Sequence, residues 1–251
     1  MNNITERHLP TPTFLYRNYL YKKQLDKIST PKYFLDIGPA NGFLLKELSL
    51  RGFSGEAIDI SKEAVKQINK NLKLNRNINV YCGDFMKSKI KNKYDLIFCF
   101  EVLEHIKNDK DALNQIARLI KPGGKVMLSF PAHKKYWSKI DEQKGHFRRY
   151  ERKEAWDKIS NSGFEIEEVY TYGFPFLFFL RFLRNRIIQH GAKNTLSKIN
   201  RTKISGLTNE YDSRLEKLFT SKYLLTPFFL IMDLFIKTDK GLGYFIVARK
   251  T

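Results

Sequence analysis

Residues able to bind a nucleotide-like ligand follow four consecutive apolar runs of the sequence. The first group is the segment 36–42, Asp-Ile-Gly-Pro-Ala-Asn-Gly, whose glycines let the backbone approach a ligand and open a helix with unpaired amides. The second is Asp59, a carboxylate that can accept both hydroxyls of a ribose. The third and fourth are the segments 82–85, Cys-Gly-Asp-Phe, and 101–106, Glu-Val-Leu-Glu-His-Ile. Because parallel strands end at one edge of a sheet, the four groups predict a single site there.

These groups need a parallel sheet to bring them together, and the hydrophobic pattern predicts one. Between residues 32 and 131 short apolar runs alternate with helical patterns, and the runs are too continuous for a sheet with one solvated face. The strands are predicted at 33–38, 55–61, 79–84, 94–100, 125–131, 165–171 and 242–250. We therefore predict a doubly wound, mostly parallel seven-stranded α/β sheet with a helical insertion between its last two strands.

The predicted elements divide the chain into three parts. Residues 1–30 form an N-terminal helical appendage, and residues 31–172 together with 242–251 form the ligand-binding α/β domain. The insertion, 173–241, is too long for a hairpin loop and is expected to carry helices. It holds two strongly apolar segments, of which 174–186 ends in arginines. These segments pack as a lid or on a second copy of the chain, or they contact a membrane surface or the substrate.

The charge of the chain has two interpretations. Its 251 residues include 45 Lys and Arg against 26 Asp and Glu, a formal charge of +19. A gene rich in A and T would scatter lysines without selection for binding, but the stretch 181–203 holds seven basic residues and no acid. Such a stretch is either a solvated face or a surface that attracts lipid headgroups or nucleic acid.

The number of cysteines and the hydropathy of the chain indicate the cellular compartment in which the protein is expected. Cys82 and Cys99 cannot form a disulfide framework, and both are expected in the core because they lie in predicted strands. Residues 1–10 do not read as a signal peptide, and the longest uncharged apolar stretch, 169–180, has 12 residues against the roughly 20 needed to cross a bilayer. We expect a cytoplasmic protein, with peripheral contact at the inner face of the membrane if 174–186 binds lipid.

The segment 33–131 resembles the class I S-adenosylmethionine-dependent methyltransferases, in the branch that acts mostly on small molecules. DIGPANG, AIDIS and GDF are similar to that family's cofactor loop, ribose-binding acid and adenine contact, and YDLIFCFEVLEHI and LIKPGGKVMLS are similar to its fourth and fifth strand signatures. The resemblance implies S-adenosylmethionine as cofactor. It implies cofactor contacts at Asp36, Gly38, Pro39, Ala40, Gly42, Asp59, Ile60, Gly83, Asp84, Phe85, Glu101 and Val102. Ala40 stands where the common form of the loop has glycine, and we expect this difference to alter the packing of the loop and leave cofactor binding intact. Asp84 has an alternative role as the cap of a helix.

The activity that the resemblance implies is methyl transfer to an oxygen or nitrogen of a small-molecule or lipid-linked acceptor. An oxygen acceptor must lose its proton, and His146 and His105 are the candidate bases. His105 has a second interpretation, in which it only holds the loop after the fourth strand. No histidine pair has metal-ligand spacing, so no metal is expected.

The segment 131–150 is dense in aromatic and basic residues and follows the fifth predicted strand, where this family commonly places substrate contacts. The candidate substrate contacts are Tyr136, Trp137, Arg149 and Tyr150. Their aromatic rings could stack on a flat substrate or shield the sulfonium. A structural loop tied down by salt bridges is the alternative.

Three other functions fit parts of the pattern. A nicotinamide dinucleotide site would require Gly-x-Gly-x-x-Gly, and residues 38–43 read Gly-Pro-Ala-Asn-Gly-Phe. An RNA methyltransferase is favoured by the positive charge, although the Asn/Asp-Pro-Pro-aromatic element used on exocyclic amines is absent after the fourth strand. A cofactor-binding partner subunit without catalysis would bind S-adenosylmethionine and turn nothing over. The oligomeric state stays open.

Overall fold

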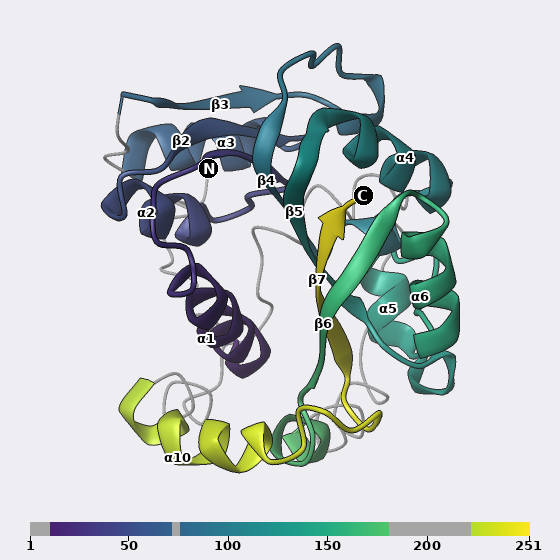
Figure 1. Cartoon of the computed structure of the whole chain (residues 1–251). Coiled ribbons are helices and arrows are strands. Elements are labelled where there is room, and N and C mark those ends of the chain that lie inside the picture. The colour runs from purple at the N-terminus through teal and green to yellow at the C-terminus, as the bar shows by residue number, and fades with distance from the viewer. Residues whose placement is uncertain (1–10, 72–75, 181–221) are drawn as a thin grey trace, which may run out of the picture.

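The computed structural model describes residues 11–71, 76–180 and 222–251, which form one seven-stranded sheet (Figure 1). The strands are β1 Tyr33–Ile37, β2 Ser54–Asp59, β3 Ile78–Cys82, β4 Tyr94–Phe100, β5 Ile120–Pro131, β6 Phe164–Tyr172 and β7 Gly243–Lys250. Their order is β3-β2-β1-β4-β5-β7-β6, and only β7 runs antiparallel to its neighbours. The predicted mostly parallel seven-stranded sheet is confirmed.

Helices precede and connect the strands in the described part of the chain. They are α1 Pro12–Leu25, α2 Phe43–Leu50, α3 Lys62–Asn71, α4 Asp109–Leu119, α5 Lys139–Lys144, α6 Arg152–Ser160 and α10 Lys222–Asp233. Ser61 caps α3, because its Oγ accepts from the Ala64 amide at 3.2 Å. Asn108 caps α4 in the same way at the Asp111 amide, which fixes where the chain enters the helix after β4.

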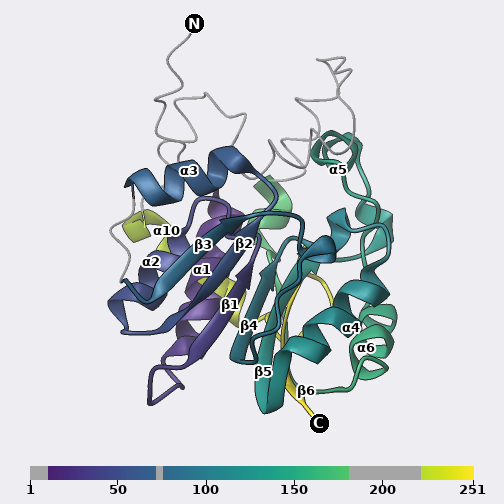
Figure 2. The same ribbon diagram turned by 90° about the horizontal axis from the view of Figure 1, so that it is seen from above.

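Both faces of the sheet are covered, as the continuous apolar strands require. Phe34 and Phe98 face one core, which they share with α1, α2 and α10, while Leu35 and Ile97 face a second core with α4 and α6 (Figure 2). Adjacent strand residues therefore point into different cores, and neither face is left polar. Burying each such side chain contributes roughly 1.5–3 kcal/mol, so the sheet is a rigid base for the loops at its edge.

The helix α1, within the predicted appendage 1–30, packs in the core that contains Phe34 and Phe98. Tyr16 and Leu20 are almost fully buried among residues of the sheet, and the Tyr16 ring lies 5.0 Å from that of Phe229 on α10. The hydroxyls of Tyr16 and Tyr19 both donate to Asp233 at 2.7 Å. These contacts join α1 to α10 along one side of the molecule (Figure 1).

The predicted insertion 173–241 is described only at its two ends, as a helical turn at 176–180 and as α10. Most of the segment 174–186 and the whole basic stretch 181–203 lie outside the described residues. Within the described part of the chain, no helix is long and apolar enough to cross a membrane.

The two cysteines differ in their surroundings. Cys99 is buried on the central strand β4, whereas Cys82 is exposed. The expectation that Cys82 lies in the core is wrong, because β3 is the edge strand of the sheet and its last two residues are left uncovered.

Candidate functional site

The loop between β1 and α2 has a backbone that favours glycine. Gly38 has a φ of +75°, and a Cβ at this position would lie 2.6 Å from Cγ2 of Val102, so a side chain does not fit. Gly42 has a φ of +69° and begins α2 without a side chain to cap it. Ala40 adopts a φ of +48°, which explains why glycine is the common residue at this position. The predicted loop therefore presents bare backbone, with Pro39 buried beneath it, at the end of β1.

Asp59 ties that loop to the end of β2. Its Oδ2 accepts from the Ala40 amide at 3.0 Å, and its Oδ1 accepts from the Ser61 amide at 2.8 Å. Each carboxylate oxygen has more than one acceptor site, so both can still accept a ribose hydroxyl. The next residue, Ile60, is 40% exposed and offers an apolar side chain beside the predicted ribose position.

Asp36 is a buried carboxyl group without a sufficient set of partners. It is 3% exposed, and its Oδ2 has no hydrogen-bond partner among the described residues. Burial and the nearby charge of Asp59 raise its pKa to about 8. A buried carboxylate of this kind is stabilised when a cation binds beside it, and an ammonium group has the required charge and donors.

The end of β3 differs from the prediction in detail. Asp84 accepts from the Met86 amide at 2.9 Å and so caps the short turn 85–87, which was the alternative role for it. Phe85 is buried in the second core, and its carbonyl accepts from Gln115 at 2.7 Å. The Phe85 ring is thus buried in the free chain, while Gly83 and Asp84 are both half-buried at this edge.

Glu101, at the end of β4, is held by a network that the sequence did not indicate. Its Oε1 accepts from the hydroxyls of Tyr172 at 2.8 Å and Ser129 at 3.1 Å, and it pairs with Arg17 at 3.2 Å. Burial opposes ionisation here and is the largest single effect, but the charge of Arg17 and the Tyr172 hydrogen bond, with smaller contributions from Lys144 and His146, together lower the pKa of Glu101. With a φ of +57° the Glu101 backbone turns sharply, which places Val102 against Gly38. Arg17 therefore connects α1 directly to the loop of the candidate site.

The two candidate bases lie in contact. The rings of His105 and His146 are 4.7 Å apart in an edge-to-face arrangement, and Nδ1 of His146 lies 3.0 Å from Oδ1 of Asp141. Burial lowers the pKa of both imidazoles, that of His105 to about 3, with the charge of His146 as the second cause for His105. Although Asp141 is buried, its hydrogen bond to His146 and the charge of Arg149 hold its pKa well below the usual range.

Glu104 lies beside these histidines and is completely buried. Its Oε1 is 4.0 Å from Nε2 of His146, and neither of its oxygens accepts a hydrogen bond from any other described residue. Burial and the charge of Glu101 raise the pKa of Glu104 well above its usual range. Potential metal-ligand atoms of Glu104, His105 and His146 lie within 4.8 Å of one another. The fold thus assembles a group that the spacing of the histidines did not predict.

The four candidate substrate contacts divide into two pairs. Tyr136 is half-buried, and Trp137 is 39% exposed, so both have surface to offer a ligand. Arg149 and Tyr150 are buried: Arg149 donates to the Ala132 carbonyl at 3.0 Å, and Tyr150 donates to Asp109 at 2.8 Å. The structure gives Arg149 and Tyr150 protein partners in place of the predicted substrate contacts. Their role is to hold the segment that carries His146.

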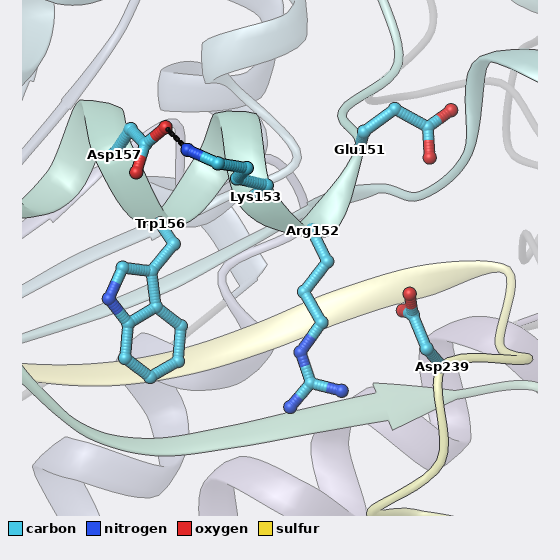
Figure 3. A pocket seen from close by; sticks show the side chains of 6 residues that line it. All are labelled: Glu151, Arg152, Lys153, Trp156, Asp157 and Asp239. Atoms are coloured by element: carbon cyan, nitrogen blue, oxygen red, sulfur yellow. Dashed lines mark hydrogen bonds and ion pairs between the residues drawn. The ribbon is translucent and has the colours of Figure 1, made fainter.

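A surface pocket lies elsewhere, beside α6. Figure 3 shows Arg152 and Trp156 extending from the helix, with Asp239 next to them from the segment before β7. The remaining lining residues are Glu151, Lys153 and Asp157. None of the twelve predicted cofactor contacts lines it, so this pocket is separate from the candidate site at the strand ends.

Comparison with known proteins agrees with the geometry. Residues 14–169 match the family model described as a methyltransferase domain, which covers more than half of the chain. The chain belongs to the class I S-adenosylmethionine-dependent methyltransferases. S-adenosylmethionine is its cofactor, and the residues present fit that molecule. Gly38 and Gly42 bring no side chain into the loop, Asp59 has acceptor capacity for its ribose, and the unpartnered Asp36 oxygen suits its ammonium group.

This methyltransferase is similar to proteins of several functions. A ubiquinone biosynthesis O-methyltransferase from Coxiella burnetii is 32% identical over 100 residues, which is 39% of this chain and 43% of that protein. The chain therefore spans less than half the length of that relative. A putative sarcosine dimethylglycine methyltransferase from Galdieria sulphuraria has a TM-score of 0.61 at 16% identity, covering 94% of this chain and 85% of that one. The N-methyltransferase NodS from Bradyrhizobium japonicum, crystallised with S-adenosyl-l-homocysteine, has a TM-score of 0.56 at 17% identity over 67% of this chain and 83% of that one.

Proposed function

We propose that this methyltransferase transfers a methyl group to a hydroxyl oxygen of a small aromatic or lipid-linked acceptor. The observation that carries the proposal is the pairing of His146 with the buried Asp141 at 3.0 Å. The carboxylate favours the proton on Nδ1 of His146, so Nε2 is the nitrogen that can accept one. Because burial lowers the pKa of His146, the imidazole is neutral at neutral pH, which is the form a general base requires.

In the proposed reaction the cofactor supplies the methyl group, and residues of the chain bind the cofactor and accept the proton of the acceptor. S-adenosylmethionine, when bound, would supply a methyl carbon that an oxygen nucleophile can attack, with the sulfur departing as a neutral thioether. In the proposed complex Asp36 pairs with the ammonium group and Asp59 accepts from the ribose. His146, with His105 against its ring, receives the proton of the acceptor hydroxyl. Orienting the oxygen towards the methyl carbon supplies much of the rate enhancement, since it replaces a bimolecular encounter.

An oxygen acceptor is favoured over a nitrogen acceptor by the presence of this base. An amine that binds unprotonated is already a nucleophile, whereas a hydroxyl must lose its proton. The relative from Coxiella burnetii named an O-methyltransferase of ubiquinone biosynthesis supports the same choice. An aromatic ring as acceptor is supported by the half-buried Tyr136 and the exposed Trp137, which lie on the segment leading to His146.

The lipid-linked acceptor is supported by apolar surface at the two described ends of the insertion. Phe179 is 58% exposed, and on and just after α10 Leu230 and Leu234 are 60% and 79% exposed. We propose that the described ends of the insertion, 176–180 and α10, touch the membrane while the α/β domain stays in the cytoplasm. The seven basic residues of 181–203, which lie outside the described residues, would add attraction to anionic headgroups.

Transfer of a labelled methyl group tests the acceptor. The purified chain is incubated with radiolabelled S-adenosylmethionine and hydroxylated benzoates or quinols, with and without a prenyl tail. We expect O-methylation that Asp141→Asn and His146→Gln each reduce by about 10²–10⁴-fold with little change in cofactor affinity. Labelling of bulk RNA, or of amines only, would overturn the proposal, and S-adenosylmethionine binding without any turnover would indicate a partner subunit.

Liposome flotation tests the membrane contact with a matched pair of variants. Leu234→Glu removes an exposed leucine just after α10, and Leu50→Glu removes one of similar exposure, 77%, on α2. We expect the wild type and Leu50→Glu to float with anionic vesicles and Leu234→Glu to float less. Equal behaviour of the two variants would show that α10 is not a membrane-facing surface.

A further inference from the structure

The surface pocket beside α6 places charges of both signs next to an exposed aromatic ring. Its volume is about 630 Å³, within the range of roughly 300–1,000 Å³ that is usual for small-molecule sites. Its lining comes from α6 and from the segment before β7 (Figure 3). We propose that this pocket binds a small zwitterion with an apolar group, namely a free amino acid with an aromatic side chain. The inference does not rest on the proposed function.

Arg152 and Trp156 form the part of the pocket that α6 provides. They stand at positions i and i+4 of this helix, so their side chains extend next to each other. The Trp156 side chain is 42% exposed, and the Arg152 guanidinium forms no hydrogen bond or ion pair with any described residue. Lys153, the other cation of the lining, pairs with Asp157 at 2.7 Å. Arg152 is therefore the cation available to hold a ligand carboxylate by two parallel hydrogen bonds, with the indole beside it for an apolar group.

Two carboxylates, Glu151 and Asp239, form the acidic side of the pocket and are held in place by the protein. Oε1 of Glu151 accepts from the Lys134 amide at 2.8 Å, and Oδ1 of Asp239 accepts from the Tyr244 hydroxyl at 2.8 Å. Their side chains are still 47% and 43% exposed, so both carboxylates keep acceptor capacity that solvent reaches. An ammonium group has the charge and the three donors that suit such a pair.

The buried imidazole of His133 lies between these two carboxylates and leaves them short of donors. It is 5% exposed, with Nδ1 3.3 Å from Oε2 of Glu151 and Nε2 3.6 Å from Oδ1 of Asp239. Nε2 has no hydrogen-bond partner among the described residues, so it faces Asp239 at a distance too long for a hydrogen bond. A neutral imidazole carries one N–H and satisfies one carboxylate at most. An ammonium group in the pocket would supply a further donor and offset the charge of Asp239.

A ligand with both charges fits this pocket better than a ligand with one. A simple anion would bind Arg152 but meet the charges of Glu151 and Asp239, and a simple cation would meet the charge of Arg152. An α-amino acid carries its ammonium and its carboxylate on one carbon, so each charge can face its opposite while the side chain covers the Trp156 ring. Bound in this way, the ligand connects α6 to the segment 234–242, which leads from the insertion into β7.

Tryptophan fluorescence reports on this pocket alone in a Trp137→Phe background. The chain has 2 tryptophans, so this substitution leaves Trp156 as the single indole. L-Phenylalanine is the probe, titrated into the full chain without S-adenosylmethionine or acceptor. We expect a saturable change in emission with a Kd of about 1 mM, since small ligands gain limited free energy per atom. Phenylpropionate, which lacks the ammonium, and phenethylamine, which lacks the carboxylate, should each bind at least about tenfold more weakly.

Arg152→Met and Asp239→Asn test the two charged sides in the same background. Arg152→Met breaks no hydrogen bond to a described residue and should fold like the parent protein, and each variant should weaken L-phenylalanine binding about 10–100-fold. Lys153→Met is the matched control, because Lys153 lines the same pocket but is paired with Asp157, and its binding should equal that of the parent. No saturable change in emission, equal binding of the three probes, or equal losses in Arg152→Met and Lys153→Met would each overturn the inference. Methyl transfer is measured separately on the wild type, so any of these results would leave the proposed function standing.

Discussion

Asp36→Asn should increase the stability of the cofactor-free protein by an amount that depends on pH. The pKa of Asp36 is about 8 in the folded chain against 3.8 as the ordinary value. Since the folded pKa is raised, the group's favourable contribution is fully present below about pH 4 and is lost as pH rises to about 8. Wild-type stability should therefore fall, relative to the Asn variant, by about 1.4 kcal/mol per pH unit across this range.

Between pH 5 and pH 7 the difference between the two proteins should thus grow by about 2.7 kcal/mol. Subtracting the two unfolding curves, measured in urea at each pH, cancels the titration of other groups and any constant effect of the substitution. Because the charge of Asp59 is the second cause of the raised pKa, the same comparison in an Asp59→Asn background should reach its plateau at a lower pH. A difference that is constant with pH would refute the idea that Asp36 is protonated in the free protein.

Cofactor binding should remove the proton that Asp36 carries in the free protein. An ammonium group placed beside Asp36 favours the carboxylate, so S-adenosylmethionine binding at pH 7 should release close to one proton. Calorimetric titration in buffers of different ionisation enthalpy counts that proton, and Asp36→Asn should bind more weakly and release none. Equal proton release by both proteins would show that the ammonium group is held elsewhere.

Three further substitutions test the described contacts by urea unfolding. Ala40→Gly should stabilise the chain by about 0.5–1 kcal/mol, since the φ of +48° is unfavourable for alanine, and destabilisation would contradict the strain. Arg17→Met should cost roughly 2–4 kcal/mol by leaving Glu101 without its cation, and adding Glu101→Gln should recover part of it; strictly additive losses would argue against the pairing. Tyr150→Phe should cost about 1 kcal/mol through the lost bond to Asp109, with cofactor affinity unchanged; weaker cofactor binding would give the ring a role in the site.

The parts of the site that were predictable are those set by local sequence. The strand at 94–100 was predicted with the bounds it has in the structure, because tyrosine and phenylalanine enclose a run that is apolar except for Asp95. The glycine loop and Asp59 were likewise placed correctly at adjacent strand ends. Glycines mark backbone with positive φ, and the carboxyl ends of parallel strands lie at the same edge of the sheet.

The parts that were missed depend on which residues the fold brings together from distant positions. Arg17 lies on a helix far from Glu101 in sequence, and nothing in its surroundings there indicates a partner. Arg149 has aromatic and basic neighbours in the sequence, which suggested a substrate contact, but in the structure its side chain pairs with the buried Asp141. For Phe85 the sequence pattern does not show to which side of the loop the ring points. In the structure the ring packs in the second core.

Asp36 and Glu104 present the same physical situation at two ends of this site. Each is a buried carboxyl group with at least one oxygen that no described residue satisfies, and each has its pKa raised by burial and by a neighbouring carboxylate. Neither arrangement stabilises the fold, because an unpaired buried polar group costs free energy. Their surroundings differ, because Asp36 precedes the glycine loop at 38–42 whereas two imidazoles lie beside Glu104. In the free protein a proton neutralises Asp36, and the ammonium group of the cofactor can replace that proton, so the buried carboxyl group makes the site selective for a positively charged partner.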